Sequence, residues 1–248
     1  MNDQYIMPNV ILSVTNINTV SISQYNQYVS WLNEHEKKRM MQCELLIAQK
    51  RFVIARGILR DYLSLHMNCH PKDVHIEVQI NGKPMLACRS FHFSISHSGN
   101  QVAIAISSSY PVGVDIECVK HGRDLLSLSD AVFLNNPDLE LLSREQLTDW
   151  FYEKWTLFEA FLKVQEGESS LFSRNDQKKF TEIDSSNNCW YRQKKLPDQY
   201  YLSLVVNSNA NASLQEIVLM DWNQSFSKSQ VASRESSGQL GGGCASDI

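Results

Sequence analysis

A run of alternating residues near the middle of the chain constrains the fold most. In the segment 112–117, apolar residues occupy every second position, and glycine or an acid fills the positions between them. This period of two predicts a β-strand with one buried face. Asp115 and Glu117 then share the other face, with Cα atoms about 6–7 Å apart, close enough for both carboxylates to reach one divalent cation. Gly113 adds no side chain beside them, which leaves room for a ligand or for another backbone.

A second segment, 155–163, has the pattern of a helix. Trp155, Glu159 and Lys163 are four residues apart and therefore lie on one stripe. A carboxylate and an ammonium one turn apart suit a metal ion and a phosphate. Plainer interpretations exist, because two acids on a strand usually form a solvated face and a Glu–Lys pair is usually a weak surface pair. For each segment taken singly, we favour the plainer interpretation.

Four segments taken together change that balance, because they resemble the motifs of the Sfp-type 4′-phosphopantetheinyl transferases in order and spacing. The segments 113–117 and 155–163 are similar to the family's paired signature, and 81–84 and 93–99 are similar to its "GKP" and "ISHS" motifs. The resemblance implies transfer of 4′-phosphopantetheine from coenzyme A to a serine of an acyl or peptidyl carrier protein. It also implies a monomeric enzyme that requires Mg²⁺, or Mn²⁺ in its place. The cytoplasmic location that we expect follows instead from the cysteines, which are scattered without paired spacing.

The resemblance also implies roles for individual residues. Asp115, Glu117 and Glu159 match the acids that hold the metal ion. Glu159 and Lys163 match the catalytic pair, with Glu159 accepting the proton of the carrier serine. The residues that match coenzyme A ligands are Lys38, Arg51, Lys83, Ser96, His97 and Lys163.

The order of the expected elements predicts an α+β fold. Helices followed by strands occur twice along the chain, which indicates two similar halves, each with helix and a small antiparallel sheet. The resemblance implies that a pseudo-twofold axis relates the halves and that the active site lies in the cleft between them. We expect an N-terminal half over 1–110 and a C-terminal half with the metal and catalytic motifs over 111–222. Residues 223–248 are rich in Ser, Gly and Gln without apolar periodicity, which predicts a disordered tail.

Helices are expected in the first half between about residues 29 and 66. Apolar residues recur every three or four positions within 51–63, which predicts an amphipathic helix. Its polar side carries Arg51, Arg56 and Arg60, a run of charge that is typical of a solvated face. Alternating runs predict strands at 74–80, 91–97 and 102–106, the first of which ends at the turn-forming pair Asn81 and Gly82.

In the second half, the segment 120–138 is polar and rich in turn-forming residues. Ser143 and Gln146 have the spacing of a capping box, which predicts the start of a helix that runs through Lys163 towards Gly167. Short strands are expected at 190–193, 200–206 and 217–220, and these give the second half its own small sheet.

The chain departs from the family pattern at two places. Phe158 stands where the family usually has a lysine, and its spacing from Phe151, Trp155 and Leu162 predicts core packing. Pro137 falls where some members supply a third acid, although Asp138 and Glu140 are close by in the sequence. These departures keep two alternatives open. One is a catalytically impaired relative that binds carrier protein or coenzyme A, and the other is a different Mg²⁺-dependent enzyme acting on a nucleotide or pyrophosphate.

Composition excludes several classes of protein. The net charge of −4 argues against a general nucleic-acid binder. The six cysteines are scattered without paired spacing, which argues against a zinc site or a disulfide framework and favours a reducing compartment. The first 20 residues contain no Lys or Arg, and no apolar stretch approaches the length of a membrane span. We therefore expect no secretion signal and no membrane or nucleic-acid partner.

Overall fold

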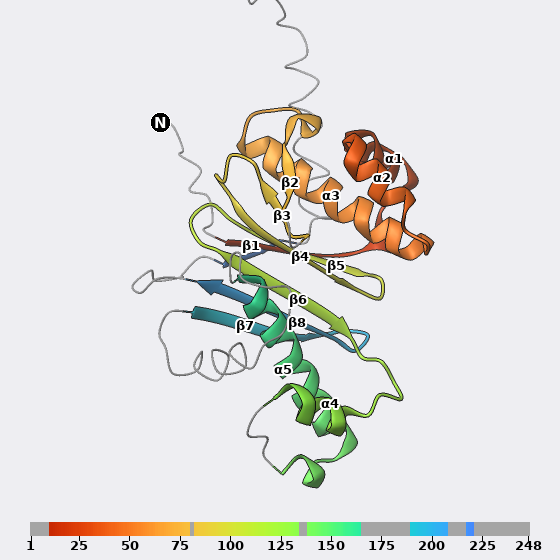
Figure 1. The fold of residues 1–248 in the computed structure, drawn as a ribbon, viewed down its shortest axis with the longest axis vertical. Helices are drawn as coiled ribbons and strands as arrows, with labels where there is room; N and C mark the ends of the chain where they lie inside the picture. Colours follow the sequence, from red (N-terminus) through yellow and green to blue (C-terminus); the bar gives the residue numbers. More distant parts are fainter. Residues whose placement is uncertain (1–9, 80–81, 134–137, 165–188, 208–216, 221–248) are drawn as a thin grey trace, which may run out of the picture.

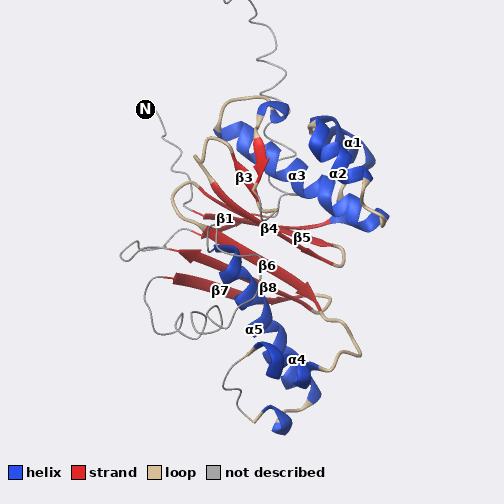
Figure 2. Ribbon diagram, viewed as in Figure 1, coloured by secondary structure: helices blue, strands red, loops and turns tan. Residues whose placement is uncertain are grey.

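The structure is a computed structural model that describes residues 10–79, 82–133, 138–164, 189–207 and 217–220. Helices and small antiparallel sheets make up both halves of the molecule, which confirms the α+β class (Figure 2). Helices α1 to α3 cover one side of a first sheet, and α5 covers the far side of a second sheet (Figure 1). The expected tail at 223–248 and the continuation of the long helix towards Gly167 lie outside the described residues.

The first sheet has the strand order β4-β5-β1-β9, in which β9 (Ile217–Met220) comes from the far end of the described chain, and β2 and β3 form a separate pair. Helix α3 packs its apolar face on this sheet and on α1. Short 3₁₀ helices follow β1 and precede β2, at Ile17–Thr19 and Pro71–Asp73. The elements are β1 (Val10–Asn16), α1 (Ile22–Trp31), α2 (Glu34–Met41), α3 (Leu46–His66), β2 (Ile76–Val78), β3 (Pro84–Leu86), β4 (His92–Ser98) and β5 (Gln101–Ser107).

The second half contains an antiparallel sheet with the strand order β6-β8-β7, on which α5 packs. Ser143 accepts a hydrogen bond from the Gln146 amide, and the Gln146 side chain accepts one from the Ser143 amide, so the predicted capping box is confirmed. A 3₁₀ helix at Leu139–Leu141 precedes it. The elements are β6 (Val112–Cys118), α4 (Leu125–Val132), α5 (Arg144–Val164), β7 (Cys189–Leu196) and β8 (Tyr200–Asn207).

Several expectations about the elements are corrected. Strand β9 (Ile217–Met220) pairs in parallel with β1 of the first sheet, so the expectation that it extends the second half's sheet is wrong. The segment expected to be turn-rich contains α4 (Leu125–Val132). The helical region begins earlier than expected, at Ile22, and the strand expected at 74–80 is limited to β2. Only the pairing of β9 depends on a partner distant in sequence, which local patterns do not encode. The starts of α1 and α4 are marked locally, because the side chains of Ser21 and Asp124 cap them.

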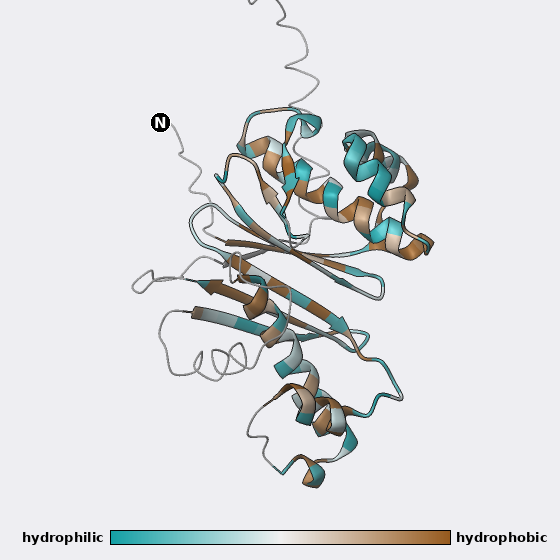
Figure 3. Ribbon diagram, in the orientation of Figure 1, coloured by the Kyte–Doolittle hydropathy of each residue, from teal (hydrophilic) through white to brown (hydrophobic). Residues whose placement is uncertain are grey.

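The charged side of α3 is not a solvated face. Arg60 is 1% exposed and pairs with Glu36 at 2.6 Å, while it also donates to the carbonyls of Pro71 and Val74. Arg56 is buried as well and lies 3.5 Å from Glu36. The charges therefore tie α2 and the 3₁₀ turn after α3 to α3, because a buried guanidinium is costly unless it is paired and hydrogen-bonded. Figure 3 shows hydrophilic α2 lying against this helix, whereas the central strands are largely hydrophobic.

Gly113 allows α5 to approach β6 closely. A Cβ atom placed at Gly113 would lie 1.9 Å from the carbonyl oxygen of Ala160 and 2.9 Å from the amide nitrogen of Val164. The sequence left two uses for the space beside Gly113, a ligand or another backbone. The structure shows that the backbone of α5 fills it. This close approach places the last turns of α5 against the strand that carries Asp115 and Glu117.

Candidate active site

The site forms where β4 of the first half lies beside β6 of the second (Figure 1). Both are edge strands of their own sheets, and side-chain hydroxyls join them instead of a backbone ladder. Ser94 accepts a hydrogen bond of 3.1 Å from the Val114 amide. Ser96 donates to Asp115 at 2.7 Å, and Ser98 donates to Glu117 at 2.7 Å. Two carboxylates of one half are thus held by hydroxyls of the other.

Asp115 is the most enclosed acid of the site, with 4% of its surface exposed. Its Oδ1 accepts hydrogen bonds from Ser96 and, at 2.7 Å, from the Lys163 ammonium. Lys163 also lies 3.2 Å from the carbonyl oxygen of Val114. Among the described residues, Asp115 Oδ2 is buried without a hydrogen-bond partner. A buried, unpartnered carboxylate oxygen is costly, so this atom is suited to receive a ligand that brings positive charge.

Glu117 and Glu159 complete a group of three acids around Lys163. Burial raises the pKa of Glu117, and the charge of Asp115 raises it further. Burial also raises the pKa of Glu159, with a second contribution in the same direction from Asp115. Ionisation of these carboxyls is therefore disfavoured in the site as it stands. A bound cation would reverse that preference, because it stabilises the charged forms.

These residues line a single pocket with a volume of about 390 Å³. Its apolar lining comes from α3, β3, β4 and Trp155 of α5, and its charged lining comes from Arg56, the three acids and Lys163. Mixed walls of this kind suit a ligand with a charged part and an apolar part. The lining residues are Phe52, Ala55, Arg56, Pro84, Ile95, Ser96, His97, Asp115, Glu117, Trp155, Glu159 and Lys163.

His97 stands at the end of β4 and lines the pocket. His97 keeps an exposed surface, but partial desolvation by the surrounding protein lowers the pKa of the imidazole, and the charge of Arg51 lowers it further. The ring is therefore neutral at pH 7, and its ring N–H remains able to donate a hydrogen bond to an anionic ligand.

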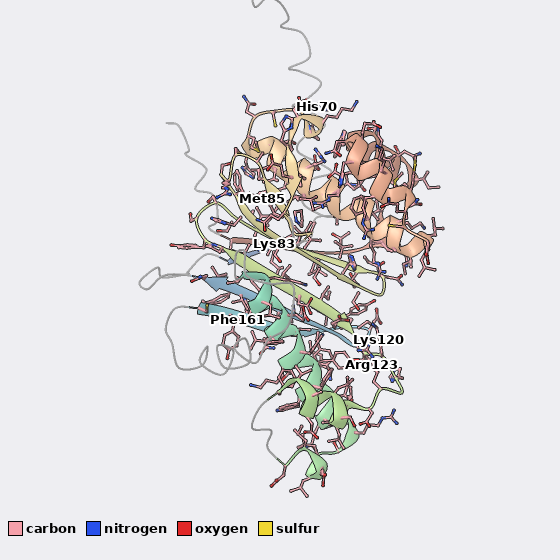
Figure 4. All side chains as sticks on the ribbon, viewed as in Figure 1. His70, Lys83, Met85, Lys120, Arg123 and Phe161 are labelled. Atoms are coloured by element: carbon pink, nitrogen blue, oxygen red, sulfur yellow. The ribbon has the colours of Figure 1, made fainter. Side chains whose placement is uncertain are left out.

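The other three predicted ligands of coenzyme A do not line this pocket. Lys38 is exposed on α2. Arg51 donates from Nη1 to the carbonyl of Gly99 at 3.4 Å, in the turn between β4 and β5. Lys83, which is labelled in Figure 4, donates to the carbonyl of Lys163 at 2.6 Å, and this bond connects the first half to the last turn of α5. Their roles towards a ligand stay predictions.

Some residues of the site were missed by sequence reasoning. Arg56 lines the pocket, stacks over the Phe52 ring at 5.5 Å, and has an Nη1 atom without a partner among the described residues. Nothing in the sequence distinguishes it from the neighbouring arginines. Ser98 did have a signal, because it lies two residues after Ser96 on the same face of β4. The matching spacing of Asp115 and Glu117 pairs the two serines with the two acids.

The donor set fits a hard divalent cation in its chemistry. Oxygen ligands from carboxylates are what Mg²⁺ prefers, and Asp115 offers a buried oxygen without a partner. Within the described ranges, however, no three His, Cys, Asp or Glu side chains are arranged as a ready metal-ligand cluster. The acids lie on the same pocket but are not drawn together, and Lys163 supplies the positive charge beside Asp115.

Comparisons with known proteins agree with the motifs. Residues 19–109 match the model of the 4′-phosphopantetheinyl transferase N-terminal domain. The chain is 32% identical over 149 residues to the 4′-phosphopantetheinyl transferase HetI of Nostoc, which covers 57% of this chain and 62% of that protein. It is 27% identical over 151 residues to Sfp of Bacillus subtilis, covering 60% of this chain and 66% of Sfp. The resemblance to the phosphopantetheinyl transferase family is confirmed.

The alignments are partial. The chain spans 62% of the Nostoc relative and 50% of a third relative, a 4′-phosphopantetheinyl transferase of Bacillus subtilis to which it is 33% identical over 116 residues. The family model covers residues 19–109, and Asp115, Glu117, Glu159 and Lys163 all lie beyond it. The activity, substrates and partners of this chain therefore do not follow from the alignments alone.

The departure from the family at Phe158 is part of the core, as its spacing predicted. Phe158 is 1% exposed, and its ring meets that of Phe133 edge to face with centroids 6.2 Å apart. The residue faces α4 instead of the pocket, whose lining does not include it. The acids near the second departure, Asp138 and Glu140, do not line the pocket either.

Restoring the family's lysine at this position should therefore harm the protein. In Phe158→Lys an ammonium would replace a ring packed against Phe133, and we expect a loss of about 2–3 kcal/mol in the free energy of unfolding. Urea unfolding of the wild type and of Phe158→Leu, which stays apolar, provides the comparison. Equal or greater stability of Phe158→Lys would show that the side chain can reach solvent and that the position is not closed core.

Proposed function

We propose that this protein transfers the 4′-phosphopantetheine moiety of coenzyme A to a serine of an acyl or peptidyl carrier protein in a Mg²⁺-dependent reaction. The observation that carries the proposal is the pocket, because polar and charged residues of both halves line it together. These residues are Ser96, His97, Asp115, Glu117, Glu159 and Lys163. The names of the relatives point to the same activity.

The chain's own residues would divide the work as follows. The carboxylate of Glu159 accepts the proton of the carrier's serine hydroxyl, and its raised pKa brings it nearer to the pH at which a base works best. The serine oxygen then forms a bond to the β-phosphorus of coenzyme A, and the pyrophosphate P–O bond breaks to release adenosine 3′,5′-bisphosphate. Lys163 and neutral His97 donate hydrogen bonds to the phosphate oxygens as charge builds up there.

Asp115, Glu117 and Glu159 would hold the divalent ion, which supplies charge neutralisation to the pyrophosphate when it is bound. Asp115 contributes its unpartnered Oδ2, while its Oδ1 stays with Ser96 and Lys163. Mn²⁺ has similar ligand preferences and should replace Mg²⁺. Lys38, Arg51 and Lys83 would provide further basic contacts for coenzyme A around the pocket.

The wider arrangement is proposed as well. We place the division between the halves at residues 110 and 111, with a pseudo-twofold axis relating 1–110 to 111–222 and the active site in the cleft between them. Strand β9 is an exception to this division, because it joins the first sheet. The protein would act as a monomer, because both halves of the site come from one chain. The five described cysteines are free, which supports a cytoplasmic location. Within the part of the chain that the structure describes, no helix is long and apolar enough to cross a membrane.

Intact-mass spectrometry of an apo carrier protein tests the proposal. After incubation with the full chain, coenzyme A and Mg²⁺, we expect the carrier to gain the mass of one phosphopantetheine, and EDTA should prevent the gain. Both an acyl and a peptidyl carrier should be tried. Binding of coenzyme A without a mass gain on either carrier would indicate the impaired relative, and consumption of coenzyme A without carrier modification would indicate a different enzyme.

The raised pKa values of Glu117 and Glu159 predict a pH-dependent stabilisation by Mg²⁺. A carboxyl whose pKa is raised on folding costs stability as the pH rises above its unfolded value near 4.5, because the folded protein must then ionise it unfavourably. Mg²⁺ binding offsets that cost by pairing with the ionised groups, worth about 2.7 kcal/mol at 100 times its dissociation constant. We therefore expect saturating MgCl₂ to raise the Tm more at pH 8 than at pH 5. An equal rise at both pH values, against NaCl of matched ionic strength, would contradict this.

A further inference from the structure

Three buried serines on β4 form a ladder that faces β6. Ser94, Ser96 and Ser98 are 4%, 8% and 5% exposed and alternate along the strand, so all three point to the same side. Strand β6 pairs with β8 through its other edge. The hydroxyls of Ser94 and Ser98 therefore accept from β6 amides in the place of a neighbouring backbone, and Ser96 joins the two halves through Asp115.

The three serines do not make the same contacts. Ser94 accepts from the Val114 amide at 3.1 Å. Ser98 accepts from the Cys118 amide at 3.1 Å in the same manner, but it also donates its proton to Glu117 Oε2 at 2.7 Å. Ser98 thus combines a structural contact with a contact to a site carboxylate. Ser94 has the structural contact without the second one.

We infer that Ser98 is a positioning residue that orients the Glu117 carboxylate towards the pocket. The hydrogen bond of 2.7 Å from the Ser98 hydroxyl restricts the torsions of a carboxyl group that is otherwise attached through three rotatable bonds. The bond becomes charge-assisted, and therefore stronger, when Glu117 is ionised. Because the hydroxyl comes from the first half and the carboxylate from the second, the orientation of Glu117 depends on how the two strands are aligned. The inference rests on the proposed function, in which Glu117 is a metal ligand.

Positioning predicts a specific difference between two matched variants. Ser94→Ala and Ser98→Ala each remove one buried hydroxyl that accepts from a β6 amide, so both should lower the Tm. Only Ser98→Ala also releases Glu117. Loss of a residue that orients a metal ligand typically weakens metal binding about 10–100-fold. We expect that loss for Ser98→Ala, unchanged affinity for Ser94→Ala, and recovery in Ser98→Thr, which keeps the hydroxyl.

The affinity of the full chain for Mn²⁺ should be measured by titration calorimetry or by the spin-resonance signal of the free ion. Crystal structures of Ser94→Ala and Ser98→Ala give a second readout, the orientation of Glu117, which does not depend on any activity. Equal Mn²⁺ affinity in the two alanine variants, or an unchanged Glu117 in Ser98→Ala, would overturn the inference. If the wild type binds no Mn²⁺, the metal part of the proposed function fails, and the orientation of Glu117 in the two crystal structures decides the positioning role by itself.

Discussion

Asp115→Asn should reduce Mg²⁺-dependent transfer to a carrier protein by at least about 10³-fold, equivalent to about 4 kcal/mol of transition-state stabilisation. The asparagine keeps the shape of the side chain but lacks the negative charge that pairs with Lys163 at 2.7 Å. It also exchanges one carboxylate oxygen for an amide group that donates instead of accepting. The proposed metal ion would lose its most buried ligand, and Lys163 would lose the partner that fixes its ammonium in the pocket.

The variant also changes the neighbouring acids in a direction that can be checked. Because the charge of Asp115 raises the pKa of both Glu117 and Glu159, its removal should lower both pKa values. Initial rates from intact-mass measurements and Mn²⁺ affinity give the functional readouts, and the far-ultraviolet dichroism spectrum checks folding. Glu140→Gln is a suitable control, since Glu140 is exposed and does not line the pocket. Near-normal transfer by folded Asp115→Asn would remove Asp115 from the proposed mechanism.

The sequence predicted which residues form the site better than it predicted the bounds of the helices and strands. The period of two in β6 and the period of four in α5 placed Asp115, Glu117, Glu159 and Lys163 on single faces, and those faces meet in the pocket. Periodicity works here because each face is buried against one neighbour. The same reasoning placed Phe158 in the core, where the structure has it.

Contacts between distant segments were beyond the reach of local patterns. Arg60 lies on the helix face that looked solvated, yet it is buried because Glu36, 24 residues earlier, returns to meet it. The parallel pairing of β9 with β1 joins residues separated by about 200 positions, and no turn signal marks it. The hydrogen bond from Ser98 to Glu117 belongs to the same class, although the matching spacing of serines and acids was visible in the sequence.

The close approach of β6 and α5 leads to the second large expected effect. In Gly113→Ala, the new methyl group would lie 1.9 Å from the Ala160 carbonyl oxygen, and this atom belongs to a backbone that cannot rotate away. Helix α5 must therefore shift from β6, which we expect to cost about 3–5 kcal/mol of the free energy of unfolding. The shift also moves Glu159 and Lys163 away from Asp115, so the folded fraction should bind Mn²⁺ and coenzyme A more weakly.

Gly57→Ala separates the positional effect from the loss of stability. A Cβ at Gly57 would lie 2.0 Å from the Tyr28 ring, where α1 packs on α3, and neither residue lines the pocket. Both glycine variants should unfold at lower urea concentrations than the wild type. Under conditions in which the protein remains folded, only Gly113→Ala should lose ligand affinity. The reason is that its added methyl group separates α5, which carries Glu159 and Lys163, from β6, which carries Asp115 and Glu117. Equal ligand affinity in the two variants would mean that the acids and Lys163 keep their arrangement without the close contact at Gly113.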